Sequence, residues 1–211
     1  ASLYGRNNLT EIVQRTAGKS FVPLCVGGGV RSVIDADVLL RSGADKVSVN
    51  TAAISRPELI GELAQRFGSQ AVVLSIEAKA TGHGTWEALV DNGREKTGVD
   101  VIDWVRRAAD LGAGEVLVTS VDRDGTGRGP DVGLIRAAVD ATPLPLIAGG
   151  GIGTPDHAVA AVRDGGCDAV CVARAVHYQE TTIAAVRHAL SEAGYHLPKR
   201  RSTDIAGGEA T

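Results

Sequence analysis

Carboxylates stand at the ends of two apolar runs of this sequence, where they could take part in acid–base chemistry. Glu77 and Lys79 close a run of Val, Leu, Ser and Ile, and Asp122 and Asp124 follow a second run. A carboxylate at the mouth of a pocket is suited to general acid–base catalysis, which makes Glu77 and Asp124 candidate catalytic residues. The competing interpretations are structural: Glu77 pairs with Lys79, and the two aspartates bond to the backbone of their own turn.

Two Gly-Gly-Gly runs, 27–29 and 149–151, also follow apolar runs. Glycine lets a phosphate approach backbone N–H groups with no Cβ in the way, although a plain tight turn explains a single run equally well. Two runs at equivalent positions favour two phosphate sites, and therefore a long substrate with a phosphate at each end. The candidate residues lie in these runs and after the next strand of each half: Gly28, Gly29, Asn50 and Thr51, then Gly150, Gly151, Ala173 and Arg174.

These candidates stand at the ends of strands that alternate with helices. A first helix is expected from Asn8, its cap, to Gly18. Strands are expected at 21–26, 46–50, 71–76, 115–120, 144–148 and 169–173, and helices at 33–42, 57–67, 100–111, 132–140, 155–164 and 182–193. This alternation indicates βα units and a parallel sheet, whose ligand sites lie at the carboxyl ends of the strands. Asn92-Gly93 predicts a β-hairpin inserted within 84–96.

An internal repeat favours a barrel over an open sheet. The run Val22–Val30 matches Leu144–Ile152 at an offset of 122 residues, and the match continues from 43–49 into 166–172. The second copy has two βα units before its glycine run, whereas the first copy lacks about 50 residues of the equivalent segment. We therefore predict an α/β fold, a (β/α)8 TIM barrel that is incomplete here with six strands. Residues 1–197 would form this N-terminally truncated domain and 198–211 a disordered tail.

Composition narrows the classes of partner. With 22 Lys and Arg against 25 Asp and Glu, the net charge is −3, which gives no attraction to nucleic acid or to an acidic membrane. No apolar run approaches the roughly 20 residues of a membrane helix. Three scattered cysteines fit a reducing, cytoplasmic compartment, and Cys25 and Cys171 are interpreted as core residues. The five histidines lack metal-ligand spacing, and no metal or cofactor is expected.

Six segments together resemble the cyclase subunit of imidazole glycerol phosphate synthase, from Ala1 to about Gly194. They are Val26-Gly-Gly-Gly29, Gly43-Ala-Asp-Lys-Val-Ser-Val-Asn-Thr-Ala-Ala53, Phe67-Gly-Ser-Gln70, Lys96-Thr-Gly98, Gly112-Ala-Gly-Glu115 and Ser120-Val-Asp-Arg-Asp-Gly-Thr126. The resemblance implies a lyase of histidine biosynthesis. Such an enzyme takes ammonia from a partner glutaminase and adds it to a phosphoribulosyl-formimino aminoimidazole carboxamide ribonucleotide. It releases imidazole glycerol phosphate and aminoimidazole carboxamide ribotide.

The resemblance also implies roles for particular residues. Glu77 stands where the family has one aspartate of its acid–base pair, and the other aspartate would precede this segment. Lys46 and Glu115 match a charged gate for ammonia at the opposite ends of their strands. One phosphate site is matched by Gly29, Asn50 and Thr51, and the other by Asp124, Gly125, Gly151 and Ala173.

Two departures from the family leave alternatives open. Glu77 is one methylene longer than the expected Asp, and Arg174 replaces a small residue, so it either strengthens phosphate binding or blocks the site. The first alternative is a paralogous subunit of surface-polysaccharide sugar amidation, which also takes ammonia from a glutaminase-like partner. The second is a truncated, non-catalytic barrel that only binds a partner.

Overall fold

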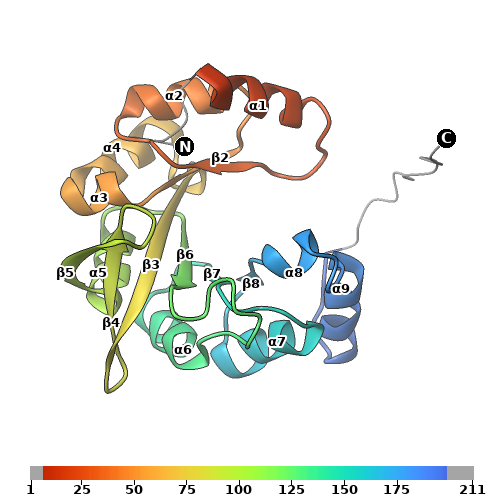
Figure 1. The fold of residues 1–211 in the computed structure, drawn as a ribbon. Coiled ribbons are helices and arrows are strands. Elements are labelled where there is room, and N and C mark those ends of the chain that lie inside the picture. The colour runs from red at the N-terminus through yellow and green to blue at the C-terminus, as the bar shows by residue number, and fades with distance from the viewer. Residues whose placement is uncertain (1–6, 199–211) are drawn as a thin grey trace.

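The computed structural model describes residues 7–198, in which six parallel strands form one curved sheet (Figure 1). The strands are β1 (Cys25–Gly27), β2 (Lys46–Val49), β3 (Val72–Gly82), β6 (Glu115–Ser120), β7 (Leu146–Gly149) and β8 (Ala169–Val170). Their order is β1-β2-β3-β6-β7-β8, each parallel to its neighbour, and the sheet stays open between β1 and β8. The expected incomplete (β/α)8 barrel is thereby confirmed. Of the expected tail, only Pro198 lies within the described residues.

Helices cover the outer face of the sheet (Figure 1). They are α1 (Asn7–Ala17), α2 (Val33–Arg41), α4 (Glu58–Phe67), α5 (Val101–Asp110), α6 (Val132–Ala141), α7 (Pro155–Ala160) and α9 (Ile183–Glu192), with short helices α3 (Thr51–Ser55) and α8 (Arg174–His177) and the turns η1 (Ser69–Ala71) and η2 (Ala161–Gly165). Polar caps start several of them: Asp100 accepts from the N–H groups of Ile102 and Asp103, and Asp131 from that of Leu134.

The core lies between the sheet and these helices. In β6, Val116 and Val118 are buried in it, while Glu115, Leu117 and Thr119 alternate onto the concave face. Fully buried large side chains come from both layers: Leu59, Ile60, Leu63, Leu74, Ile76, Leu134 and Leu146. Each contributes about 1.5–3 kcal/mol by leaving water, so the helix layer holds the strand ends in place.

The inserted hairpin is confirmed and extends the sheet. β4 (Thr85–Val90) pairs antiparallel with β5 (Glu95–Asp100) and with the second half of β3, where Glu77 lies opposite Leu89. This pairing explains why β3 runs beyond the expected end at Ile76. The turn bends through positive φ at Asp91, Asn92 and Gly93, which places it beside the carboxyl end of the sheet.

The repeat is visible in backbone geometry. Gly28 and Gly29 have φ of +90° and +91°, and Gly150 and Gly151 have +88° and +84°. In each half, an aspartate carboxylate accepts a hydrogen bond from the backbone of the segment that leads to the glycine run. The carboxylate of Asp45 accepts from the N–H of Leu24 at 2.7 Å, and that of Asp168 from the N–H of Leu146 at 2.9 Å. The two halves therefore share local structure as well as residues.

Several expectations at the edges of the elements are wrong. β1 begins at Cys25 instead of Phe21, and Phe21 and Val22 are 90% and 69% exposed. Pro23 has no N–H, and that of Leu24 is bound by Asp45, so strand pairing starts only afterwards. β8 ends at Val170, three residues before its expected end. The helix expected at 155–164 is present, as α7 followed directly by the π-helix η2.

Two further corrections concern single residues. Cys25 and Cys171 are exposed, because they belong to the two ends of the open sheet and no neighbouring strand covers them there. Asn8 lies inside α1, which begins at Asn7, and is therefore not its cap. Cys167, by contrast, is buried, and its Sγ donates to the carbonyl of Ala161 at 3.3 Å.

Candidate functional site

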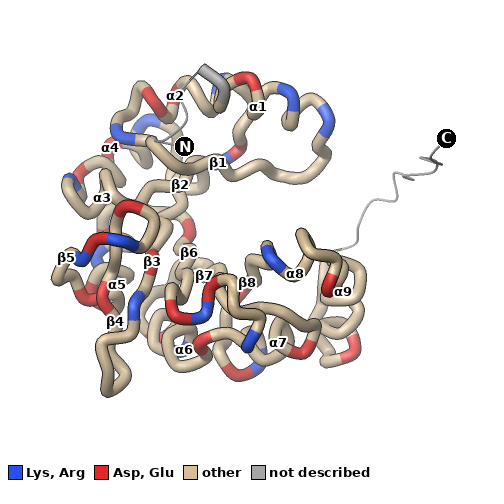
Figure 2. The backbone as a smooth tube through the Cα atoms, in the orientation of Figure 1, with Lys and Arg blue, Asp and Glu red and all other residues tan. Residues whose placement is uncertain are grey.

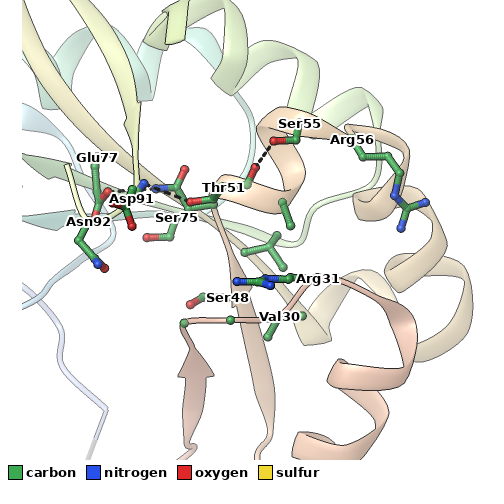
Figure 3. Close-up of a pocket in the computed structure, with 15 residues that line it drawn as sticks. Val30, Arg31, Ser48, Thr51, Ser55, Arg56, Ser75, Glu77, Asp91 and Asn92 are labelled. Carbon is green, nitrogen blue, oxygen red and sulfur yellow. Dashed lines mark hydrogen bonds between the residues drawn. The ribbon is translucent and has the colours of Figure 1, made fainter. Parts of the chain in front are cut away.

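A cavity of about 530 Å³ opens at the carboxyl ends of β1, β2 and β3. It is lined by the first glycine run, by Asn50 and Thr51 after β2, and by Glu77 of β3. The hairpin turn adds Asp91 and Asn92, which Figure 3 shows grouped with Glu77 on one side, while Arg31 lies across the cavity. The structure thus brings the first candidate phosphate site and the first candidate catalytic residue into one cavity.

Glu77 is half-buried at this point of β3 and is held by two donors. Nδ2 of Asn50 donates to Oε2 at 3.2 Å, and the backbone N–H of Gly93 in the hairpin turn also donates to the carboxylate. Burial raises the pKa of Glu77, and the nearby charges of Asp124 and Asp91 raise it further. A carboxyl group whose pKa is shifted toward neutrality is suited to exchange protons with a substrate.

The structural interpretation of Glu77 as the partner of Lys79 is wrong. Lys79 forms its ion pair with Asp122, which also accepts from the N–H of Ala80 at 2.9 Å. Asp122 therefore ties the loop after β6 to β3, and Glu77 is left in the lining of the cavity. The Lys79 ammonium, acting mainly through its hydrogen bond, lowers the pKa of Asp122.

Asp124 lies in the turn after β6, where its N–H donates to the carbonyl of Ser120 at 2.8 Å. Its side chain is exposed, and its charge acts on Glu77. The two candidate catalytic carboxylates therefore belong to β3 and to the turn after its neighbour β6, near enough for the charge of one to act on the other. Gly125 follows with φ of +69° and open space where a Cβ would stand.

The first candidate phosphate site is only partly as expected. Gly29 has φ of +91° and nothing within 4 Å of a Cβ position, so its backbone faces open space. Asn50, however, turns its amide away: Nδ2 also donates to the carbonyl of Leu89 at 3.1 Å, and the buried Oδ1 has no partner among the described residues. Asn50 therefore links the phosphate candidates to Glu77 and the hairpin.

The sequence reasoning missed Arg31, Asp91 and Asn92 as residues of this cavity. The position of Arg31, two residues after the glycine run, is a sequence feature that indicates a place near the phosphate candidates. The two hairpin residues had none, because their place depends on β4 pairing with β3.

The second candidate site is more closely packed. A Cβ on Gly150 would lie 2.6 Å from the carbonyl oxygen of Ser120, and one on Gly151 would lie 2.2 Å from that of Gly129. The N–H of Gly129 donates to the carbonyl of Gly151 at 2.8 Å, which joins the loops after β6 and β7. Ala173 precedes α8, and Arg174 begins it. The glycines here allow two loops to approach each other, and the guanidinium of Arg174 lies beside them.

Lys46 and Glu115 form an ion pair at the opposite, amino ends of β2 and β6. Their side chains are 27% and 23% exposed, and they span the concave face across the intervening strand β3. The structure therefore joins the two residues to which the family resemblance assigns a gate.

Comparisons with known proteins agree with this arrangement. The family model described as "Histidine biosynthesis protein" matches residues 1–182. The chain belongs to this family. It is also 58% identical over 153 residues to the imidazole glycerol phosphate synthase subunit HisF of Legionella pneumophila. The match covers 72% of this chain and 72% of that protein. The resemblance found in the sequence is thereby confirmed, and cyclase-type lyase chemistry in histidine biosynthesis is the function that these matches support.

Charge and helix length add little to the identification. Figure 2 shows acidic and basic residues interspersed along the helices of the described chain. Within residues 7–198, the helices are too short or too polar to cross a membrane.

Proposed function

We propose that this chain is the cyclase subunit of imidazole glycerol phosphate synthase. In this role it uses ammonia to convert phosphoribulosyl-formimino aminoimidazole carboxamide ribonucleotide into imidazole glycerol phosphate and aminoimidazole carboxamide ribotide. The observation that carries the proposal is Glu77, a half-buried carboxylate with a raised pKa, in the lining of the cavity that also holds the first glycine-rich cluster. Belonging to the histidine biosynthesis family supports the same activity.

Glu77 would act as the acid–base residue of ring closure. The addition of ammonia and the closure of the ring both require protons to leave nitrogen and to reach a leaving group, and a carboxyl group whose pKa is raised by burial can serve both steps. The Asn50 amide and the Gly93 N–H would hold the carboxylate toward the substrate. Asp124, in the turn after β6, would bind a substrate hydroxyl or share the proton transfer.

The two glycine clusters would hold the two phosphates of the substrate. Gly28, Gly29 and Thr51 supply backbone and hydroxyl groups at one end of the cavity, together with Arg31. Gly125, Gly150, Gly151, Ala173 and Arg174 would bind the second phosphate from the loops after β6, β7 and β8, outside this cavity. Because Glu77 lies on β3, between the strands that carry the two clusters, a substrate bound at both clusters would present its middle to Glu77.

Ammonia would come from a glutaminase subunit that forms a heterodimer with this chain in the cytoplasm. The relative from Legionella is itself named as a subunit of a synthase, which supports an assembly of this kind. Lys46 and Glu115, joined at the amino ends of their strands, would form the entrance for ammonia on the face away from the substrate.

The test is ammonia-dependent turnover by the full-length protein without its partner, followed as the appearance of imidazole glycerol phosphate. We expect turnover in the wild type and its loss in Glu77→Gln. Expression of the gene should also restore growth of a histidine auxotroph that lacks the cyclase. A folded full-length protein that fails both assays would overturn the proposal in favour of the sugar-amidation paralogue or a binding role.

A further inference from the structure

Arg174 and Glu180 form a two-bond ion pair beside the second glycine cluster. Nη1 of Arg174 donates to Oε2 of Glu180 at 2.5 Å, and Nη2 donates to Oε1 at 2.7 Å. The side chains are 38% and 39% exposed, so water reaches both partners. The carboxylate thus occupies the face of the guanidinium with which arginine binds carboxylates and phosphates alike.

The turn after α8 is shaped to bring Glu180 back to Arg174. Gln179 has φ of +59°, the left-handed conformation that normally favours glycine at this position. The N–H of Glu180 donates to the carbonyl of Ala175 at 2.8 Å, and that of Gln179 to Val176 at 3.1 Å, as in a Schellman motif. A non-glycine residue costs free energy in this conformation, but the turn keeps it and so holds the carboxylate in front of the guanidinium.

The guanidinium of Arg174 lies beside Gly127, in the loop after β6 that carries part of the second glycine cluster. Its Nη1 is 2.9 Å from the position that a Cβ on Gly127 would take, and Gly153 lies on the other side of that position. The same guanidinium is 5.6 Å from the ring centroid of Tyr178, which supports it from behind. Arg174 therefore reaches the loops after β6 and β7, where Gly125 and Gly151 stand.

We propose that Arg174 is the anion-binding side chain of the second phosphate site, and that Glu180 is a competitor built into the chain. A phosphate monoester would displace the Glu180 carboxylate and take over its two hydrogen bonds. The inference rests on the proposed function only in placing a substrate phosphate here. It explains how an arginine can stand beside a phosphate site without blocking it, because the ion pair holds the guanidinium aside until an anion arrives.

The competition makes a quantitative expectation possible. Partly exposed ion pairs stabilise a protein weakly, so releasing Arg174 from Glu180 should improve phosphate affinity by only about two- to fivefold. Loss of the guanidinium removes charge-assisted hydrogen bonds and should weaken binding by about tenfold or more. The effect of Glu180 should disappear once Arg174 has been replaced, because a competitor has no effect without its target.

The experiment titrates inorganic phosphate into the full-length protein by isothermal calorimetry at fixed ionic strength. The variants are Glu180→Gln, Arg174→Gln and the double variant. Asp164→Asn is the matched control, because it removes one carboxylate from an exposed pair, with Arg163, that lies in η2 and does not involve Arg174. We expect tighter phosphate binding in Glu180→Gln and weaker binding in Arg174→Gln than in the wild type. The double variant should bind as Arg174→Gln does, and the control should bind as the wild type does.

Two results would overturn the proposal. One is an unchanged phosphate affinity in Glu180→Gln. The other is tighter binding that persists in the double variant or appears in Asp164→Asn, which would reflect net charge only. The outcome is separable from the proposed function: turnover without this phosphate response would refute only the competitor, whereas the response without turnover would refute only the cyclase activity.

Discussion

Replacing Glu77 with Gln should lower activity and raise stability in the same protein. The substitution keeps the shape of the side chain and an oxygen that can accept from Asn50 and from the Gly93 N–H, but it removes the exchangeable proton. Positioned acid–base groups contribute about 10²–10⁴-fold to rate, so kcat should fall within this range. KM should stay nearly constant, because the phosphates carry the binding.

The gain in stability follows from the raised pKa of Glu77. Its folded-state pKa lies above the value in the unfolded chain, mainly because of burial, then because of Asp124 and Asp91. The wild type is therefore stabilised by this group below about pH 4 and loses that contribution as pH rises through the folded-state pKa. Gln carries no charge at any pH, so the variant should unfold at a higher temperature than wild type at neutral pH and lose this advantage in acid.

The assays are steady-state turnover with ammonia and thermal unfolding between pH 4 and pH 8. Glu95→Gln is the control, since it removes an exposed carboxylate from the same hairpin. Glu77→Asp is the second variant. It draws the carboxylate back by about 1.5 Å, which breaks the 3.2 Å bond from Asn50 but keeps the proton. Its rate should lie between those of the wild type and the Gln variant.

Turnover in Glu77→Gln within a few-fold of wild type would refute the catalytic role and leave Asp124 as the candidate. A lower unfolding temperature at neutral pH would refute the electrostatic reasoning, because it would mean that the charged form of Glu77 is stabilised by its surroundings.

Three further predictions follow from the glycine runs, the ion pair and the open sheet. Gly29→Ala should lower the free energy of unfolding by about 1–2 kcal/mol, through its positive φ only. Gly151→Ala should lower it clearly more, because its Cβ would also lie 2.2 Å from the Gly129 carbonyl oxygen. Urea unfolding measures both values, and equal losses would contradict this reasoning. Lys46→Ala and Glu115→Ala should show a coupling energy of about 1 kcal/mol in a double-mutant cycle that high salt weakens, and additive effects would count against the pair. The 211-residue chain should self-associate through the unpaired edges of β1 and β8, and light scattering from a monodisperse monomer would oppose this.

The sequence predicted the architecture well because the strand ends carry unusual residues. The glycine runs and the aspartates of each half recur at a constant offset, and the structure repeats their contacts as well as their positions. The sequence predicted the solvent exposure of side chains poorly at the two edges of the sheet. An apolar residue such as Phe21, or a thiol such as Cys25, resembles a core residue in sequence, and only strand pairing decides whether anything covers it.

The candidate site was predicted as separate residues, without their connections. Nothing in the local sequence indicates that Asn50 donates to Glu77, or that Lys79 is taken by Asp122, because both contacts join different strands. The pKa of Glu77 likewise depends on Asp91 and Asp124, which the hairpin and the turn after β6 bring near.

The alternation of charge along the carboxyl face has a consequence for substrate selection. Carboxylates occupy the middle of this face, at Glu77, Asp91 and Asp124, and guanidinium groups stand toward its two ends, at Arg31 and Arg174. A phosphate is repelled from the middle and attracted to either end, so a molecule with two phosphates can avoid the repulsion only if it is long enough to span the carboxylates. On the proposed function, we therefore expect the face to select substrates by the distance between their two phosphates, independently of the base or sugar.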